Sequence, residues 1–212
     1  MTGSDKQPSA PRALRYLHCS GESIRPHVDA LAALRMQVFR TFPYLYDGDI
    51  AYERAYLETY IASERSLAFL VYDGAALVGA TTALPMRDEE AAFSQPLAAA
   101  GFDVSRLFYF GESLLLPAYR GNGLGHRFFA ERETWAGDAG DFSHACFCSV
   151  QRPADHPLRP AGHQPLDAFW RRRGYARRDD IVAAYRWQDI DQDHETTKQL
   201  VFWVRALAQE SD

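Results

Sequence analysis

Three glycines at the junction between a strand and a helix are the most informative chemical feature of this sequence. A strand is predicted over residues 107–116, and Pro117 ends it. The segment Arg120-Gly121-Asn122-Gly123-Leu124-Gly125 follows and opens an amphipathic helix, with Leu124, Phe128, Phe129 and Trp135 predicted to face inward and Arg127, Glu131 and Arg132 outward. Glycines leave backbone N–H groups uncovered, and the start of a helix carries partial positive charge. The junction therefore suits a phosphate or pyrophosphate group.

Two common phosphate-binding motifs do not match this segment. A Walker loop needs Gly-Lys-Ser/Thr, and no lysine lies near the glycines. A dinucleotide-binding fingerprint needs G-x-G-x-x-G, whereas the spacing here is G-x-G-x-G.

Residues 114–125 (LLLPAYRGNGLG) closely resemble motif A of the GNAT superfamily of N-acetyltransferases, whose signature is R/Q-x-x-G-x-G/A after a strand. Residues 169–175 (FWRRRGY) resemble the F-Y-x-x-x-G-F segment that ends the second conserved region of this family. Two predicted helices before a β-hairpin also match the family's order of elements, so the likeness covers about residues 12–208. The alternative is a glycine turn with a purely structural role.

The resemblance implies binding of acetyl-CoA as cosubstrate and direct acetyl transfer to an amine. It implies a mixed α+β fold with a central, mostly antiparallel twisted sheet of about seven strands, helices on both faces, and fourth and fifth strands splayed into a cofactor cleft. Pantetheine would pair with the backbone of Leu115, and backbone amides of the glycine loop would hold the pyrophosphate. The implied cofactor-binding residues are Leu114, Leu115, Leu116, Arg120, Gly121, Asn122, Gly123, Leu124, Gly125 and His126.

The catalytic groups depart from the family pattern. A frequent family position for the general base is occupied here by Tyr109, and Glu112 follows on the same strand. Strand alternation places these two side chains on opposite faces unless a bulge intervenes. Glu112 is therefore either the base or a structural ion-pair partner.

The proton donor to the leaving thiolate is also altered. Many members have a tyrosine where this chain has Trp170, and an indole cannot act as a phenol does. Ser149 and Tyr175 are candidate donors, which the sequence does not rank, and residues 151–164 form a longer loop than the family's usual one.

Aromatic and acidic residues lie together between the first two predicted helices. Tyr44 and Tyr46, next to Asp47 and Asp49, are the candidate substrate-binding residues, because acidic and aromatic groups attract a cationic amine. An ordinary packed turn is the alternative. No metal site is expected: Cys146 and Cys148 share one strand face and are better explained as core thiols.

The remaining elements follow from periodicity and turn signals. Strands are predicted at residues 13–17, 67–72, 76–84 and 142–150, with a last hairpin at 181–190 and 199–207. Helices are predicted from Ser23 to Phe39, after a cap at Asp49, within 85–105 on the surface, and over 166–173 with Gly174 as its end.

The composition is that of an ordinary soluble protein. The 212 residues have a net charge of −5, 47% are hydrophobic and 24% charged, which argues against disorder, a membrane span and a nucleic-acid binder.

Residues 1–12 are predicted to be a flexible tail and residues 13–208 a single domain. We expect a cytoplasmic monomer or homodimer that acetylates a small-molecule or peptide amine. The alternative is a module of the same fold that binds acyl-CoA as a sensor or partner domain without turnover.

Overall fold

The computed structural model describes residues 13–207. The predicted tail, residues 1–12, lies outside the described residues, as does residue 208. Every described strand belongs to one sheet, which begins at Leu14 and ends at Ala206.

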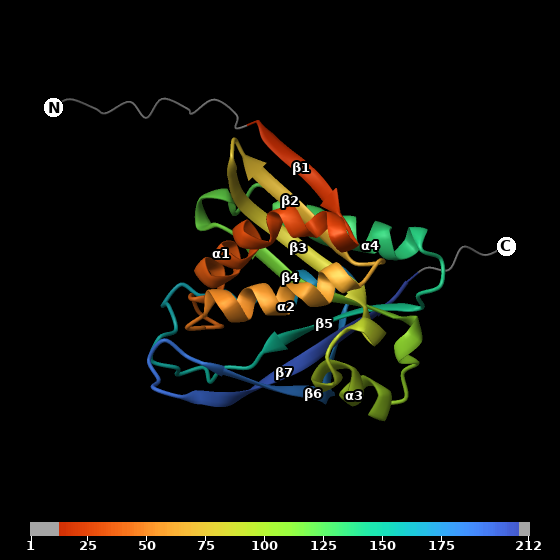
Figure 1. The fold of residues 1–212 in the computed structure, drawn as a ribbon. Helices are drawn as coiled ribbons and strands as arrows, with labels where there is room; N and C mark the ends of the chain where they lie inside the picture. The colour runs from red at the N-terminus through yellow and green to blue at the C-terminus, as the bar shows by residue number, and fades with distance from the viewer. Residues whose placement is uncertain (1–12, 208–212) are drawn as a thin grey trace.

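Seven strands form this sheet in the order β1-β2-β3-β4-β5-β7-β6 (Figure 1). The strands are β1 (Leu14–Cys19), β2 (Leu67–Asp73), β3 (Ala76–Pro85), β4 (Leu107–Leu115), β5 (His144–Val150), β6 (Ala176–Gln188) and β7 (Glu195–Ala206). All neighbouring pairs are antiparallel except β4 and β5, which are parallel. The predicted, mostly antiparallel seven-stranded sheet is confirmed.

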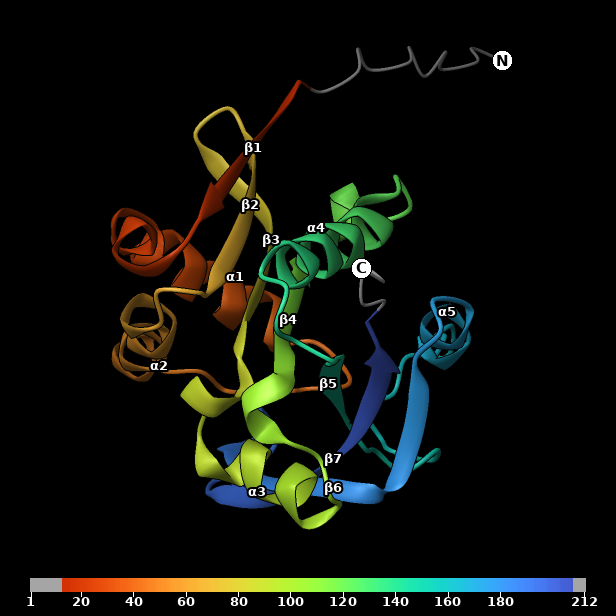
Figure 2. The same cartoon turned by 90° about the vertical axis from the view of Figure 1, so that its right-hand side faces the viewer.

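Helices cover both faces of the sheet, as predicted. The α-helices are α1 (Val28–Phe39), α2 (Ile50–Ala62), α3 (Ala91–Ala99), α4 (Leu124–Asp138) and α5 (Asp167–Arg172), and short 3-10 turns are η1 (Gly21–His27), η2 (Met86–Asp88), η3 (Val104–Arg106) and η4 (Pro117–Tyr119). Figure 2 shows α1 and α2 on one side of the sheet and α4 and α5 on the other. Helices α1, α2 and α3 share one apolar core, and α4 and α5 bury their aromatic residues in a second.

Local sequence signals explain several boundaries. The Asp49 side chain accepts hydrogen bonds from the N–H groups of Ala51 and Tyr52, which caps α2 as predicted. Gly74 and Gly174 have φ values of 59° and 86°, so they supply the left-handed backbone that ends β2 and α5.

Other boundaries differ from the prediction. The first helix starts as the 3-10 turn η1, because Pro26 has no N–H for an α-helical bond. Strands β6 and β7 start at Ala176 and Glu195, earlier than predicted, and a register shift between Arg178 and Val182 interrupts the alternation that the sequence analysis used.

The sheet opens between its two central strands. Only residues 107–109 of β4 pair with residues 144–146 of β5. Beyond this point β4 continues beside β3 as far as Leu115, whereas β5 continues beside β7 as far as Val150. The expected splay of the fourth and fifth strands is therefore present.

Among residues 13–207, no helix is both long enough and apolar enough to cross a lipid bilayer.

Candidate active site

A β-bulge in β4 brings the two candidate catalytic side chains to one face. Thr82 of β3 is opposite Glu112, but the next residue, Ala83, is opposite Phe110, so Gly111 is the extra residue. This bulge, which the sequence analysis named as the condition for Glu112 to share a face with Tyr109, is present. A Cβ on Gly111 would overlap the Tyr60 hydroxyl, so only glycine fits at this position.

Tyr109 and Glu112 line a cavity of about 310 Å³, which we call the tyrosine pocket. Its lining residues are Arg35, Phe39, Tyr44, Tyr46, Asp47, Asp49, Tyr52, Glu53, Tyr56, Phe93, Tyr109, Gly111, Glu112, Cys148, Tyr185, Arg186, Trp187, Gln188, Glu195 and Leu200. The two residues predicted to bind substrate, Tyr44 and Tyr46, are both among them.

Inside the tyrosine pocket, one buried guanidinium lies between two buried carboxylates. Arg35 of α1 forms ion pairs with Glu53 of α2 and with Glu112. Glu53 is fully buried and Glu112 is 8% exposed, yet Glu112 Oε2 has no hydrogen-bond partner. Burial alone would lower the pKa of Arg35, but the neighbouring Tyr56 and Glu53 reverse this and raise it. The guanidinium therefore stays charged.

The sequence analysis did not identify Arg35 or Glu53 as site residues. Arg35 occupies a position on the apolar stripe of the first helix. A charged residue at such a position was the available sequence signal for a buried ion pair. Its two partners come from a second helix and a strand, which sequence spacing does not connect to it.

The Tyr109 hydroxyl contacts a thiol at the back of the pocket. Its distance to Cys148 Sγ is 3.1 Å. Burial raises the pKa of Tyr109 well above its ordinary value and that of Cys148 to about 12, so both groups stay protonated near neutral pH. Burial also raises the pKa of the nearby Glu89 to about 7.

A second cavity, of about 520 Å³, lies where β4 and β5 part; we call it the sheet cleft. Residues of β4, β5, α4, α5 and the loop 151–165 line it. It shares Gly111, Glu112 and Cys148 with the tyrosine pocket, together with Phe39 and Tyr44. The two cavities thus meet at the β4 bulge.

The glycine loop lies before the first turn of α4. Gly121 and Gly123 have φ values of 79° and 81°, which β-carbon-bearing residues rarely adopt. A Cβ on Gly121, Gly123 or Gly125 would meet nothing within 4 Å, so the space in front of the loop is open. Of the ten residues predicted to bind the cofactor, Gly125 lines the sheet cleft.

The other predicted cofactor residues have varied surroundings. Leu114 is fully buried in the core below α1 and α2, whereas Leu115 and Leu116 are half-buried. The Arg120 side chain donates to the Leu115 carbonyl at 3.2 Å, and the exposed His126 ring packs against Phe169.

Arg132 contradicts its predicted orientation. It is 2% exposed and lines the sheet cleft, whereas the helix periodicity placed it outward. Its guanidinium donates to the Glu112 carbonyl and the Ser113 hydroxyl on β4, and it lies over the Phe110 ring. These contacts with β4 hold the side chain inside, and burial lowers its pKa to about 10.

The candidate proton donors are separated in space. Ser149 lines the sheet cleft, as does Trp170, whereas Tyr175 is buried in the second core beside Glu133. Tyr109 lines the tyrosine pocket, and its hydroxyl contacts Cys148, which lines both cavities.

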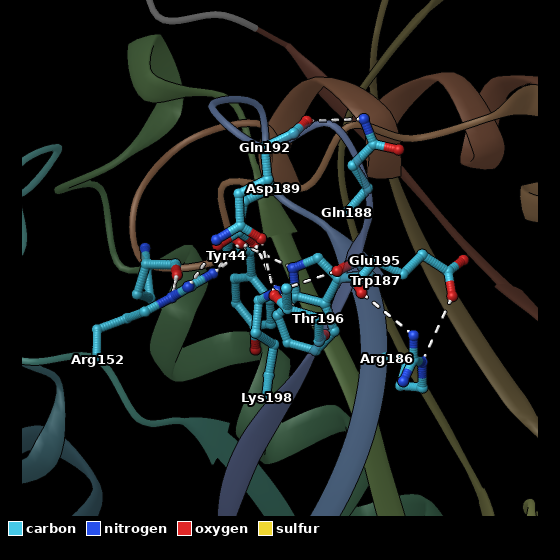
Figure 3. Close-up of polar contacts among 11 residues, drawn as sticks. Tyr44, Arg152, Arg186, Trp187, Gln188, Asp189, Gln192, Glu195, Thr196 and Lys198 are labelled. Carbon is cyan, nitrogen blue, oxygen red and sulfur yellow. Dashed lines mark hydrogen bonds and ion pairs between the residues drawn. The ribbon is translucent and has the colours of Figure 1, made fainter.

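A buried polar cluster fixes the loop that carries Tyr44 (Figure 3). Asp189 is 1% exposed and pairs with Arg152 at 2.6 Å and with Lys198 at 3.2 Å. Arg152 in turn donates to the carbonyls of Pro43 and Tyr44, and Trp187 Nε1 also donates to the Tyr44 carbonyl. The cluster therefore joins the 151–165 loop to the wall of the tyrosine pocket.

Cysteine and histidine side chains do not gather into a metal-binding group within residues 13–207: no three or more His, Cys, Asp or Glu are suitably placed. Cys146 is fully buried, while Cys148 lines both cavities.

No family model matches this sequence, and no curated protein matches it. Solved structures do match the fold. The N-acetyltransferase of Staphylococcus aureus Mu50 aligns with a TM-score of 0.57 and 12% identity over 92% of this chain and 99% of that one. Arabidopsis thaliana NAA60, in complex with a bisubstrate analogue, aligns with a TM-score of 0.56 and 10% identity over 92% of this chain and 100% of that one. Salmonella typhimurium yncA, with its cofactor acetyl-CoA, aligns with a TM-score of 0.55 and 12% identity over 94% of this chain and 97% of that one.

The Staphylococcus and Salmonella proteins are named as acetyltransferases, and other matching structures carry the GNAT family name. The chain therefore has the fold of the GNAT acetyltransferases, as its motifs indicated.

Proposed function

We propose that this protein is an acetyl-CoA-dependent N-acetyltransferase, with acetyl-CoA in the sheet cleft and the acceptor amine in the tyrosine pocket. The observation that carries the proposal is that the two cavities meet at Gly111, Glu112 and Cys148, on the two strands that part. A thioester reaching this point from one cavity would face an amine held in the other. The fold and its acetyltransferase neighbours support the same reaction class.

The glycine loop supports a phosphorylated cosubstrate. Open space lies in front of Gly121, Gly123 and Gly125, and the 15-residue helix α4 begins there with its positive end. A pyrophosphate held at this end would leave a pantetheine arm to run along the cleft towards the β4 bulge.

Glu112 and Tyr109 are suited to the two proton transfers. The amine nitrogen attacks the thioester carbonyl, a C–N bond forms and the C–S bond breaks. In this proposal Glu112, through its unpartnered Oε2, accepts the proton that the amine loses. Tyr109, whose hydroxyl lies 3.1 Å from Cys148 Sγ where the two cavities meet, supplies a proton to the leaving thiolate.

A second candidate function is acyl-CoA binding without turnover. The ion pair between Glu112 and Arg35 favours it, because this pair alone would account for a buried carboxylate on β4. Trp170 at the usual position of a phenol favours it as well.

Release of free thiol separates the two functions. Purified protein is mixed with acetyl-CoA and a panel of primary amines, and the thiol is followed in the steady state while the amines are analysed for a mass gain of one acetyl group. The proposal predicts many turnovers per protein molecule and an acetylated amine. Acetyl-CoA binding without amine-dependent thiol release would contradict it and establish the non-catalytic alternative.

A further inference from the structure

The tyrosine pocket carries an excess of negative charge around its two arginines. Arg35 is already held by two carboxylates, Glu53 and Glu112. Arg186, at the exposed rim, pairs with Glu195, and its Nη2 donates to the Glu195 carbonyl at 3.2 Å. Both guanidinium groups of the pocket are therefore already paired with carboxylates that line it.

Two further acidic residues line the same pocket. Asp47 pairs with Arg40, which is not one of the lining residues, and Asp49 caps α2 with its carboxylate. The lining set therefore holds five carboxylates against two guanidinium groups. Within the ion-paired cluster, Glu112 Oε2 and Glu53 Oε1 are buried without a hydrogen-bond partner, so carboxylate oxygens of this pocket remain able to accept from a donor.

Aromatic rings form most of the remaining wall. Tyr52 and Tyr185 are joined through their hydroxyl groups at 2.7 Å, and the Tyr56 ring lies under the Arg35 guanidinium. Tyr46 and Trp187 complete this part of the lining. Aromatic faces attract cations and pack against flat apolar groups. The volume of about 310 Å³ is at the small end of ligand sites, which favours a small amine.

We propose that the acceptor is a small cationic amine with a flat apolar or aromatic body and with no carboxylate near its nitrogen. This inference rests on the proposed function and adds its substrate class. The ammonium group is attracted by the excess of carboxylates, and the body packs between the tyrosine rings. The ammonium gives one proton to Glu112 and so becomes a neutral amine that can attack. Its second proton leaves as the C–N bond forms and balances the proton that Tyr109 gives to the thiolate. An amino acid would bring another carboxylate into a pocket whose cationic groups are already paired.

Matched amines that differ at one group test this substrate class. Tyramine, tyrosinamide and tyrosine share the same phenol ring and primary amine, and only tyrosine carries a carboxylate. We expect kcat/KM for tyramine to exceed that for tyrosine by at least about 100-fold. Tyrosinamide, which is as large as tyrosine but lacks its negative charge, is expected within about tenfold of tyramine.

Variants of the acidic lining test the physical cause. Glu53→Gln removes one partner of Arg35 and one negative charge, so the tyramine-to-tyrosine ratio should fall at least about tenfold. Asp47→Asn, at the half-exposed rim, should lower the ratio in the same direction without disturbing the buried ion pairs. A residue with only a structural role would change both kcat/KM values equally and leave the ratio unchanged.

The outcomes distinguish the two proposals. Tyrosine acetylated as efficiently as tyramine, or thiol release with other amines but not with tyramine, would overturn the substrate class while leaving the acetyltransferase proposal intact. A ratio unchanged in both variants would also overturn the charge argument. Acetyl-CoA binding with no thiol release for any amine would overturn the proposed function first.

Discussion

Arg35 joins two carboxylates that differ in what surrounds them. Glu53 lies on α2 and is fully buried, whereas Glu112 lies at the bulge where both cavities meet. A general base must contact the reacting amine, and only Glu112 lines the cleft as well as the pocket. The two glutamates therefore provide a matched comparison between catalysis and ion pairing.

We predict that Glu112→Gln lowers kcat by at least about 100-fold, because the amine loses its proton acceptor. Acetyl-CoA affinity should be nearly unchanged. Glu53→Gln, which also removes a partner of Arg35, should lower kcat for tyramine much less. Steady-state thiol release and calorimetric titration with acetyl-CoA measure both quantities. Equal loss of kcat in the two variants would show that Glu112 is needed for its ion pair with Arg35 and not for proton transfer.

Single residues were partly predictable from the sequence. The glycine loop follows from local spacing, since it lies at one junction between a strand and a helix. Tyr109 and Glu112 became candidates through the family resemblance. Arg35 and Glu53 do not, because an ion pair between two helices depends on tertiary packing. Arg132 was predicted wrongly because helix periodicity identifies an apolar stripe but not a guanidinium that bonds to a neighbouring strand.

The side-chain arrangement of strand β4 depends on one glycine. The bulge at Gly111 turns Glu112 to the face of Tyr109, and a side chain at this position would strike the buried Tyr60 hydroxyl and lie 2.9 Å from Thr82 Oγ1. A close approach of this kind cannot be relieved by a small movement of exposed groups.

We predict that Gly111→Ala destabilises the protein by about 1–3 kcal/mol through overpacking. Gly125→Ala is the matched control, because its Cβ would meet nothing within 4 Å, and its free energy of unfolding should change by less than about 0.5 kcal/mol. Urea denaturation of the two variants measures the difference. Equal stability would mean that the bulge does not need glycine.

Hairpin β6–β7 supplies the cluster that fixes the Tyr44 loop. Burial alone would raise the pKa of Asp189, but Arg152 and Lys198 reverse this and lower it. The stability that Asp189 contributes is therefore present above its ordinary pKa and is lost as the pH falls through the lowered value.

We predict that Asp189→Asn costs about 3 kcal/mol, since it leaves Arg152 and Lys198 without their buried partner. The KM of the amine and that of acetyl-CoA should both rise, because Tyr44 lines both cavities and its loop loosens. Asp180→Asn, an exposed carboxylate on the same strand that pairs with Arg178, is the control and should change neither KM. Unchanged KM values in Asp189→Asn would contradict a role of this cluster in holding the Tyr44 loop.

Element types and their order were predictable because hydrophobic period and turn residues are local signals. The hairpin after residue 66, the cap at Asp49 and the strand before the glycine loop all occur as predicted. The earlier starts of β6 and β7 were not predictable. These strand ends are stabilised by pairing with each other and do not show an alternating pattern.

At the scale of the whole molecule, one buried carboxyl group links stability to pH. Glu89 is 7% exposed, its Oε2 has no hydrogen-bond partner, and burial raises its pKa to about 7 from an ordinary value of 4.5. The folded state therefore holds this proton more strongly than the unfolded state. Its contribution is complete below pH 4.5 and is lost as the pH rises through 7.

We predict that Glu89→Gln is more stable than the wild-type protein at pH 8, by about 3 kcal/mol, and that the difference disappears near pH 4.5. The amide keeps the shape of the acid but does not ionise. Glu64→Gln, at an exposed position, is the control. Thermal unfolding across this pH range measures the difference, and a constant difference at all pH values would contradict the assignment.

The molecule as a whole consists of a sheet that opens where two cavities meet. Strands β1–β4 form one half and β5–β7 the other, joined by three paired residues in each of β4 and β5. In the proposed function, acetyl-CoA lies in this opening, with its phosphates at the start of α4. Two glycines lie at opposite ends of α4, and a Cβ on either Gly125 or Gly137 would meet nothing within 4 Å.

Calorimetric titration with acetyl-CoA of the wild-type protein, Gly125→Phe and Gly137→Phe tests this assignment most directly. The account predicts saturable binding to the wild-type protein and to Gly137→Phe, and at least about tenfold weaker binding to Gly125→Phe, whose ring would occupy the cleft entrance. Equal affinity in all three, or no binding to the wild-type protein, would contradict the central claim that the sheet cleft holds acetyl-CoA.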